Sequence, residues 1–190
     1  MDLLLLGPQG SGKGTQAKLV AADHGVPHIS TGDMFRAAIA AGTELGRRVE
    51  PLLEAGELVP DELTVELIRE RLAQPDAAGG FVLDGFPRNL AQARALDAML
   101  AEIDRELDAI LFFDLPDRVA VERLLGRAQE EGRSDDTPET IARRLEIYHE
   151  QTEPVVEHYR ATSKLVPLHA DRGVGEVQQQ IQRALELVRA

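Results

Sequence analysis

The chain has 190 residues, of which 43% are hydrophobic and 28% are charged, and its formal net charge is -12. This length fits one domain with a sizeable core. The acidic balance argues against a protein that binds nucleic acid or a membrane surface, since either needs a basic face. Because there is no cysteine, disulfides and cysteine-ligated zinc are excluded. The leucines at residues 3–6 are too few for a signal-peptide core or a membrane span, so we expect a cytoplasmic protein.

Short apolar runs recur along the chain and predict the strands of a sheet. They occupy residues 3–6, 81–85, 109–115 and 164–170, with a weaker candidate around Ile29. Because these runs lack polar alternation, they suit parallel strands that are covered on both faces. Amphipathic helical stretches lie between them. Asp61 is a predicted N-cap of one helix, and Thr137 caps another with Pro138 at the first helical position. The alternation predicts an α/β fold with a parallel five-stranded sheet flanked by helices.

Two stretches interrupt this alternation within a single domain that spans residues 1–190. Residues 30–59 have a helical pattern without a strand, which predicts a small inserted helical lobe. Residues 126–134 are polar and contain two glycines, so we expect an exposed, mobile loop, and composition alone favours a simple solvated connection. The core of the domain is then residues 1–29, 60–125 and 135–190.

The segment "GPQGSGKGT" at residues 7–15 follows the first apolar run and precedes a helical pattern. It matches the first seven positions of the phosphate-binding P-loop pattern, whereas Gly14 stands where Ser or Thr is expected and Thr15 comes one position later. Glycines let successive backbone N–H groups point inward around an anion, and the helix that follows offers its positive end. Lys13 adds a charge for the outer phosphates. An ordinary glycine-rich turn needs no such lysine, so the segment indicates nucleotide binding.

Further motifs agree with one family of P-loop proteins. Gln16 follows "GKGT", and four more segments occur in order: "STGDMFR" (30–36), "GELVPDEL" (56–63), "LDGFPRNLAQA" (83–93) and "GRSDDTPETIARRL" (132–145). With these motifs the chain resembles the adenylate kinases, a family of nucleoside-monophosphate kinases, and in particular their short-lid, zinc-free type. The resemblance implies a P-loop NTPase-type fold in which residues 30–59 are the NMP-binding lobe and residues 126–134 are the lid. It also implies a monomer that catalyses ATP + AMP ⇌ 2 ADP with Mg²⁺ and without zinc.

The resemblance also assigns the residues that bind ATP. Arg123 and Arg127 are four positions apart, hence on one face of the helix after Pro116, and they would attend the phosphates from the lid side. Arg172 falls where the family uses a main-chain carbonyl to contact the ATP adenine. Asp84 ends the third apolar run and would hold Mg²⁺ through water, although a turn former or helix cap would also fit there. The remaining ATP-binding residues implied are those of the P-loop: Gly10, Ser11, Gly12, Lys13, Gly14 and Thr15.

For the acceptor AMP, the resemblance implies a second set of residues. Arg36 and Arg88 would hold the monophosphate, and the side chains of Thr31 and Gln92 would read the adenine edge. Arginine suits phosphate because its planar fork binds two oxygens at once. Asp135 and Asp136 would order the lid arginines or contact ribose-side groups, or would serve only as cap and dipole partners. The complete AMP set is Thr31, Arg36, Glu57, Leu58, Val59, Gly85, Phe86, Pro87, Arg88, Gln92, Arg133 and Arg144. The catalytic set is Lys13, Arg88, Arg123, Arg127, Arg133 and Arg144, of which Arg133 and Arg144 would clamp the transferring group.

Other functions compete with this hypothesis. The same chemistry on UMP or CMP is disfavoured by Thr31 and Gln92, at which pyrimidine-preferring relatives typically differ. A nucleotide-gated switch would use the P-loop without turnover, but it would need a single nucleotide site, whereas this chain carries two sets of phosphate-binding residues. A purely structural α/β domain would need neither set.

Overall fold

The computed structural model describes residues 1–131 and 136–189. Five parallel strands form one sheet in the order β2-β3-β1-β4-β5. The strands are β1 (Asp2–Leu6), β2 (His28–Ser30), β3 (Phe81–Asp84), β4 (Ala109–Asp114) and β5 (Leu165–His169). In the centre, Leu4 of β1 pairs with Leu83 on one side and Ile110 on the other. The predicted α/β fold is confirmed, including the weak candidate strand around Ile29.

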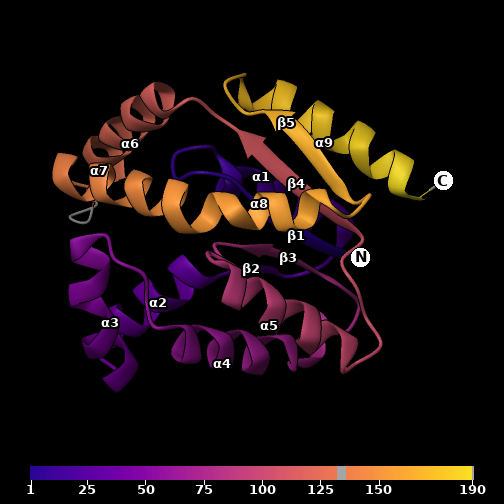
Figure 1. The fold of residues 1–190 in the computed structure, drawn as a ribbon, viewed down its shortest axis with the longest axis horizontal. Coiled ribbons are helices and arrows are strands. Elements are labelled where there is room, and N and C mark those ends of the chain that lie inside the picture. The colour runs from indigo at the N-terminus through magenta and orange to yellow at the C-terminus, as the bar shows by residue number, and fades with distance from the viewer. Residues whose placement is uncertain (132–135, 190) are drawn as a thin grey trace.

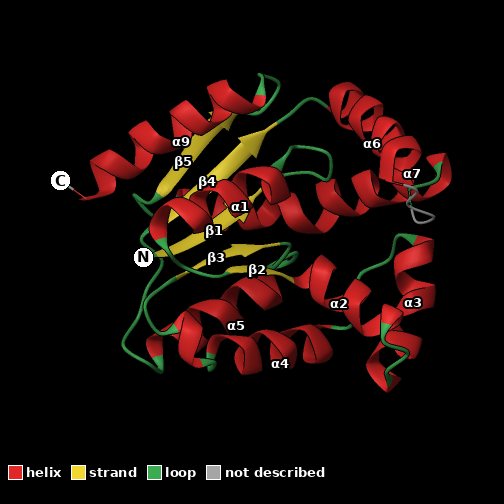
Figure 2. Cartoon of the chain, turned by 180° about the vertical axis from the view of Figure 1, so that it is seen from behind, coloured by secondary structure: helices red, strands yellow, loops and turns green. Residues whose placement is uncertain are grey.

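Helices cover both faces of the sheet (Figures 1 and 2). Along β1, Leu3 and Leu5 pack into one apolar cluster, whereas Leu4 and Leu6 pack into another, because successive side chains of a strand point to opposite faces. The first cluster includes α1 (Lys13–His24), α6 (Asp117–Glu131), α7 (Pro138–Ile147) and α9 (Val174–Arg189). The second includes α4 (Asp61–Leu72), α5 (Leu90–Ala101) and α8 (Glu153–Arg160), which a π-helical turn (Tyr148–Thr152) joins to α7.

Two further helices, α2 (Thr31–Ala40) and α3 (Glu44–Ala55), form a lobe beside the carboxyl end of β2 (Figure 2). Its small core is built on Phe35, Val49 and Val59. Helices α2 and α3 thus occupy most of the predicted helical stretch at residues 30–59, whereas Ser30 ends β2 and residues 56–59 are not helical. Within the described ranges, none of the helices is both long and apolar enough to cross a bilayer.

Two local predictions are wrong. The predicted loop at residues 126–134 is helical as far as Glu131, because α6 continues through Gly126, and one glycine costs a helix only about 1 kcal/mol. Residues 132–134 lie outside the described residues. Asp61 is the first residue of α4 rather than its N-cap, a position that Pro60 occupies without a side-chain cap. Thr137, in contrast, caps α7 as expected by accepting a hydrogen bond from the Thr140 N–H.

Candidate active site

The P-loop joins β1 to α1 in a conformation that depends on glycine. Gly12 caps α1 in the left-handed region, with φ 85°, which a residue with a Cβ rarely adopts. Gly10 lies so close to α6 that a Cβ there would stand 2.8 Å from the Ala120 carbonyl oxygen. The N-terminus of α1, with its unpaired N–H groups, therefore faces the loop, as anion binding requires.

Lys13, the first residue of α1, folds back over the loop. Its ammonium donates to the carbonyl oxygens of Gly7 (2.8 Å) and Pro8 (2.7 Å) and to the Ser11 hydroxyl (3.3 Å). The pKa of Lys13 is lowered from 10.5 to about 8, chiefly by burial and also by the positive charges of Arg88 and Arg127, while the negative charge of Asp84 opposes the shift. The ammonium is thus short of negative partners, and a bound phosphate would supply them.

This shift predicts a pH dependence of ATP binding. Below pH 8 Lys13 is charged in the nucleotide-free protein, and above pH 8 it loses its proton. Because bound phosphate raises the lysine pKa, binding above pH 8 takes up a proton, and we expect the affinity for ATP to weaken progressively from pH 8 to pH 9.5. Calorimetric titrations at several pH values check this. Lys13→Met, which cannot titrate, should bind ATP weakly and should not show this fall in affinity with pH. An equal pH dependence of ATP affinity in the two proteins would contradict the role of Lys13 in phosphate binding.

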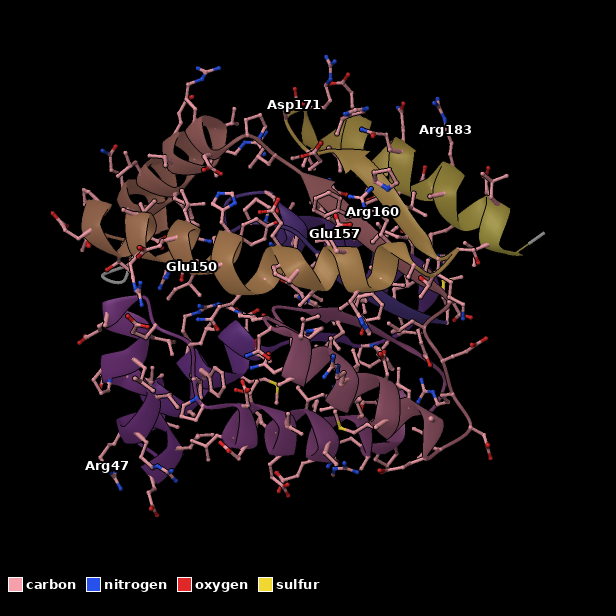
Figure 3. All side chains as sticks on the ribbon, in the orientation of Figure 1. Arg47, Glu150, Glu157, Arg160, Asp171 and Arg183 are labelled. Carbon is pink, nitrogen blue, oxygen red and sulfur yellow. The ribbon has the colours of Figure 1, made fainter. Side chains whose placement is uncertain are left out.

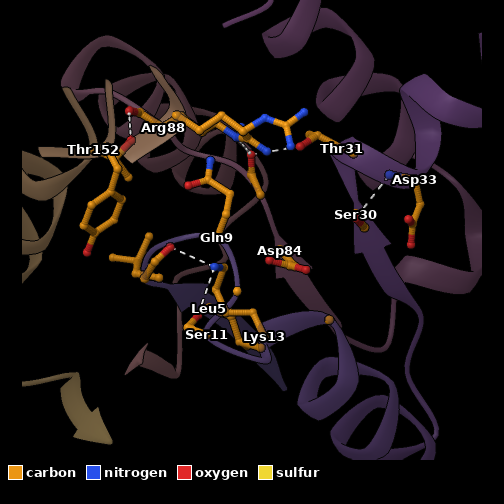
Figure 4. A pocket seen from close by; sticks show the side chains of 18 of the residues that line it. Leu5, Gln9, Ser11, Lys13, Ser30, Thr31, Asp33, Asp84, Arg88 and Thr152 are labelled. Atoms are coloured by element: carbon orange, nitrogen blue, oxygen red, sulfur yellow. Dashed lines mark hydrogen bonds between the residues drawn. The ribbon is translucent and has the colours of Figure 1, made fainter. Parts of the chain in front are cut away.

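Arginines from several elements converge on one cavity of about 360 Å³ that also contains the P-loop. Figure 4 shows Lys13, Asp84 and Arg88 around it, whereas charged side chains such as Arg47 and Arg183 point outward at the periphery (Figure 3). Burial lowers the pKa of Arg88, and so do the charges of neighbouring cations. Such a concentration of positive charge in a protein of net charge -12 marks a site for a highly charged anion. Its arginines are Arg36, Arg88, Arg123, Arg127 and Arg144.

Asp136 links two of these arginines. Its carboxylate, which is fully buried, accepts two hydrogen bonds from Arg127 (2.8 and 2.9 Å) and one from Arg144 (2.7 Å). The residue therefore orders two cations of the cavity, which is the first of the roles expected from the sequence. Asp135 lies outside the described residues. Arg123 is held separately by the carbonyl oxygen of Ala170 at 2.8 Å.

Asp84 ends β3 at the floor of the cavity. Its burial alone would raise the pKa of its carboxyl, but the adjacent His28, 3.8 Å away, and the charges of Lys13 and Arg88 outweigh burial, so the pKa lies below its usual value. The carboxylate is therefore ionised and presents negatively charged oxygen atoms to the cavity. Gly14 of the P-loop lies next to this carboxylate without blocking it. Even a Cβ at that position would stand 3.7 Å from the Oδ2 atom of Asp84, which is an ordinary contact distance.

The half of the cavity next to α2 and α3 contains the residues predicted to read a base. The Thr31 hydroxyl donates to the Gly85 carbonyl at 2.8 Å, so it keeps only its oxygen lone pairs for a ligand. The buried Gln92 amide and the segment 57–59 also line this half. Apolar and hydrogen-bonding groups are thus combined there, as in sites that hold a planar base.

Helix α7 bridges the two halves by contacting the end of α3. Arg144 donates to the Leu53 carbonyl at 3.1 Å, and Thr140 donates to the Glu54 carbonyl at 2.9 Å. Arg143 forms an ion pair with Glu57 at 2.7 Å. Helix α7 therefore carries one of the arginines of the cavity and also holds the end of α3 and the start of segment 57–59 in place.

Most of the predicted site residues line this cavity, with three exceptions. Phe86 is buried in the apolar cluster on the α5 side of the sheet, whereas its neighbours Gly85 and Pro87 line the cavity. Arg172 is exposed outside the cavity, and only its carbonyl oxygen approaches Arg123, at 3.5 Å. Arg133 lies outside the described residues. The residues brought together are Gly10, Ser11, Gly12, Lys13, Gly14, Thr15, Thr31, Arg36, Glu57, Leu58, Val59, Asp84, Gly85, Pro87, Arg88, Gln92, Arg123, Arg127 and Arg144.

Sequence reasoning missed several residues of the cavity. Tyr148 and Thr152 come from the π-helical turn, and the Thr152 hydroxyl donates to the Arg88 carbonyl at 2.7 Å. No motif marks either residue, and only the packing of this turn against the β3–α5 connection reveals them. Gln9 also lines the cavity, and its position inside the P-loop could have identified it as a site residue.

A P-loop at the carboxyl end of a parallel sheet, beside a cavity on which several arginines converge, is typical of P-loop kinases that act on small phosphorylated substrates. The family model described as adenylate kinase matches residues 5–164. The chain is 49% identical to an adenylate kinase of Stenotrophomonas maltophilia over the full length of both proteins. It is 47% identical to one of Parvibaculum lavamentivorans, over 97% of this chain and 92% of that protein. It is 43% identical to one of Streptomyces griseus, over 100% and 98%. The chain belongs to the adenylate kinase family.

Membership confirms the function expected from the motifs. The protein is an adenylate kinase enzyme, a nucleotide-binding transferase that moves the terminal phosphoryl group of ATP to AMP and forms two ADP. The sequence motifs and the family model agree over the same part of the chain, from the P-loop to the region of α7.

Proposed function

We propose that the two halves of the cavity divide the substrates as the sequence motifs predict. ATP would lie with its phosphates on the P-loop, between Lys13 and the pair Arg123 and Arg127. AMP would lie beside α2 with its phosphate between Arg36 and Arg88. The observation that carries this proposal is the single cavity, in which cations from opposite sides surround a space continuous with the P-loop.

In-line transfer between two nucleotides needs positioning and charge neutralisation more than acid–base chemistry. Two nucleotides that approach each other through their phosphates repel, and Arg144, which lines the cavity and is held by Asp136, would neutralise charge where they meet. Arg133 would join it from the lid. We propose that lid residues close over ATP and exclude water, which strengthens every charge contact inside.

Mg²⁺ would enter with ATP as part of the substrate. The residues fit it: the ionised Asp84 carboxylate and the Thr15 hydroxyl offer hard oxygen ligands, and Mg²⁺ commonly keeps most of its positions for water and phosphate. Bound there, the ion supplies neutralisation of phosphate charge. Among the described residues, no group of three His, Asp or Glu side chains could hold a metal ion by protein ligands alone. We further propose a zinc-free monomer that acts in the cytoplasm without nucleic-acid or membrane partners.

The acceptor preference tests the assignment of the second half. With ATP as donor, we expect kcat/KM for AMP to exceed that for UMP or CMP by at least roughly tenfold, because a base that leaves a hydrogen-bonding group unpaired loses about 1–3 kcal/mol per group. ADP formation measured with AMP, UMP, CMP and GMP in turn decides the matter. Equal turnover with UMP would refute the adenine site while leaving phosphoryl transfer intact.

A further inference from the structure

The carboxylate of Asp61 lies at the start of α4, where the sequence predicted a helix cap. It caps nothing, and its Oδ1 atom instead accepts two hydrogen bonds from side-chain amides. One comes from Asn89 at 2.9 Å and the other from Gln92 at 2.8 Å. Asp61 therefore acts on the β3–α5 connection, far along the chain from its own helix.

These contacts determine how the Gln92 amide is turned. Its Oε1 atom accepts from the Arg88 backbone N–H at 2.8 Å, while its Nε2 atom donates to Asp61. If the amide were reversed, its NH₂ group would face the Arg88 backbone N–H, which is also a donor. Its oxygen would then face the Asp61 carboxylate, which is also an acceptor. Gln92 is only 1% exposed, so water has little access to relieve either conflict. The pair of contacts thus selects one of the two orientations.

Asp61 is itself held in place. Asn89 caps α5 by accepting from the Gln92 backbone N–H at 2.9 Å, and this turns its amide nitrogen toward Asp61. The charge on the carboxylate strengthens both amide contacts, because hydrogen bonds to an ionised acceptor are about twice as strong as neutral ones. Asp61, Asn89 and Gln92 therefore form a small polar network behind the acceptor half of the cavity.

The orientation of this amide has consequences for a base. With these contacts made, Gln92 keeps one N–H donor and one oxygen lone pair. The adenine edge offers the complementary pair, an amino donor at C6 and an acceptor at N1. The 6-oxopurine of IMP reverses both positions, with an oxygen at C6 and a proton on N1, so it would match the reversed amide.

We propose that Asp61 is a positioning residue that determines acceptor specificity by fixing the Gln92 amide in the orientation that reads adenine and rejects 6-oxopurines. The inference rests on the proposed function, in which Gln92 faces the acceptor base. It adds a residue that contacts no substrate yet decides which purine is read.

The experiment compares kcat/KM for AMP and for IMP, with ATP as donor, in the wild type and in Asp61→Ala. We expect the AMP-to-IMP ratio to fall by about tenfold, the effect of losing a hydrogen bond to a charged group, while KM for ATP stays within about twofold. Asp61→Asn keeps an acceptor oxygen and should retain more of the ratio. Glu62→Ala removes the neighbouring charge on an exposed position of the same helical turn and should leave the ratio unchanged. If Asp61→Ala loses equal factors of kcat/KM for AMP and for IMP, Asp61 has a merely structural role and the inference is overturned. If Asp61→Ala fails to fold, the same comparison is made with Asp61→Asn.

Gln92→Leu separates this inference from the function on which it rests. If Gln92→Leu leaves the AMP-to-IMP ratio unchanged, Gln92 does not read the base, and the proposed acceptor site fails together with the inference. If Gln92→Leu collapses the ratio but Asp61→Ala does not, only the role of Asp61 is refuted. With both proposals correct, adding Asp61→Ala to Gln92→Leu should change the ratio no further, since the two residues act through one amide.

Discussion

Replacing Lys13 with methionine should lower kcat by about 10²–10³-fold, the loss seen when one preorganised charge stabiliser is removed from an active site. The ammonium lies in the P-loop among three oxygen acceptors and lines the cavity. During transfer, negative charge spreads over the moving phosphoryl group and its neighbours, and no other lysine or arginine approaches from within the loop at residues 7–15. Methionine keeps much of the apolar stem while removing the charge.

The same variant should not lose stability without nucleotide. The lowered pKa of Lys13 means that folding disfavours its charged form, so the charge opposes folding below about pH 8. From pH 8 to pH 10.5 the unfolded chain binds more protons than the folded one, and this penalty fades. We therefore expect the Tm of nucleotide-free Lys13→Met at pH 7 to equal or exceed that of the wild type. ADP formation and thermal melting are the two measurements, and near-normal kcat would refute the P-loop assignment.

Replacing Arg144 with alanine should reduce kcat by about 10²-fold or more, while the affinity for AMP changes far less. Arg144 reaches the cavity from α7, positioned by Asp136 and by the Leu53 carbonyl. We expect its charge to act mainly on the transferring group, whereas Arg36 and Arg88 hold the AMP phosphate. The fold should persist because Asp136 keeps its two hydrogen bonds to Arg127.

The matched control is Arg94→Ala, an exposed arginine of α5 that is not among the residues lining the cavity. Steady-state kinetics with AMP and ATP varied in turn separate kcat from KM. Comparable kcat in Arg144→Ala and Arg94→Ala would contradict the role of α7 in transfer. Arg133→Ala, which changes a residue outside the described part of the chain, is expected from the sequence motif to show a loss of similar size.

Local features of the site could be predicted because their physics is local. The P-loop follows from glycine and lysine spacing between a strand and a helix, since the anion nest is made by consecutive backbone N–H groups. Arg123 and Arg127 could be placed on one face because a helix turns every 3.6 residues. The end of α6 could not be predicted, because polar residues and Gly126 are compatible with either a helix or a loop.

The fold class, the phosphate loop and the family could be predicted because each depends on short-range patterns that the chain carries in order. The joint roles of segments that lie far apart in the chain depend on tertiary packing. In the folded protein Phe86 lies in the core and Arg172 lies outside the cavity. Thr152 forms a hydrogen bond with the Arg88 carbonyl. Tertiary packing also joins Asp61 to Gln92, 31 residues apart. Such contacts depend on how helices pack on the sheet, and a carboxylate at a helix start has the same local signal whether it caps that helix or binds an amide elsewhere.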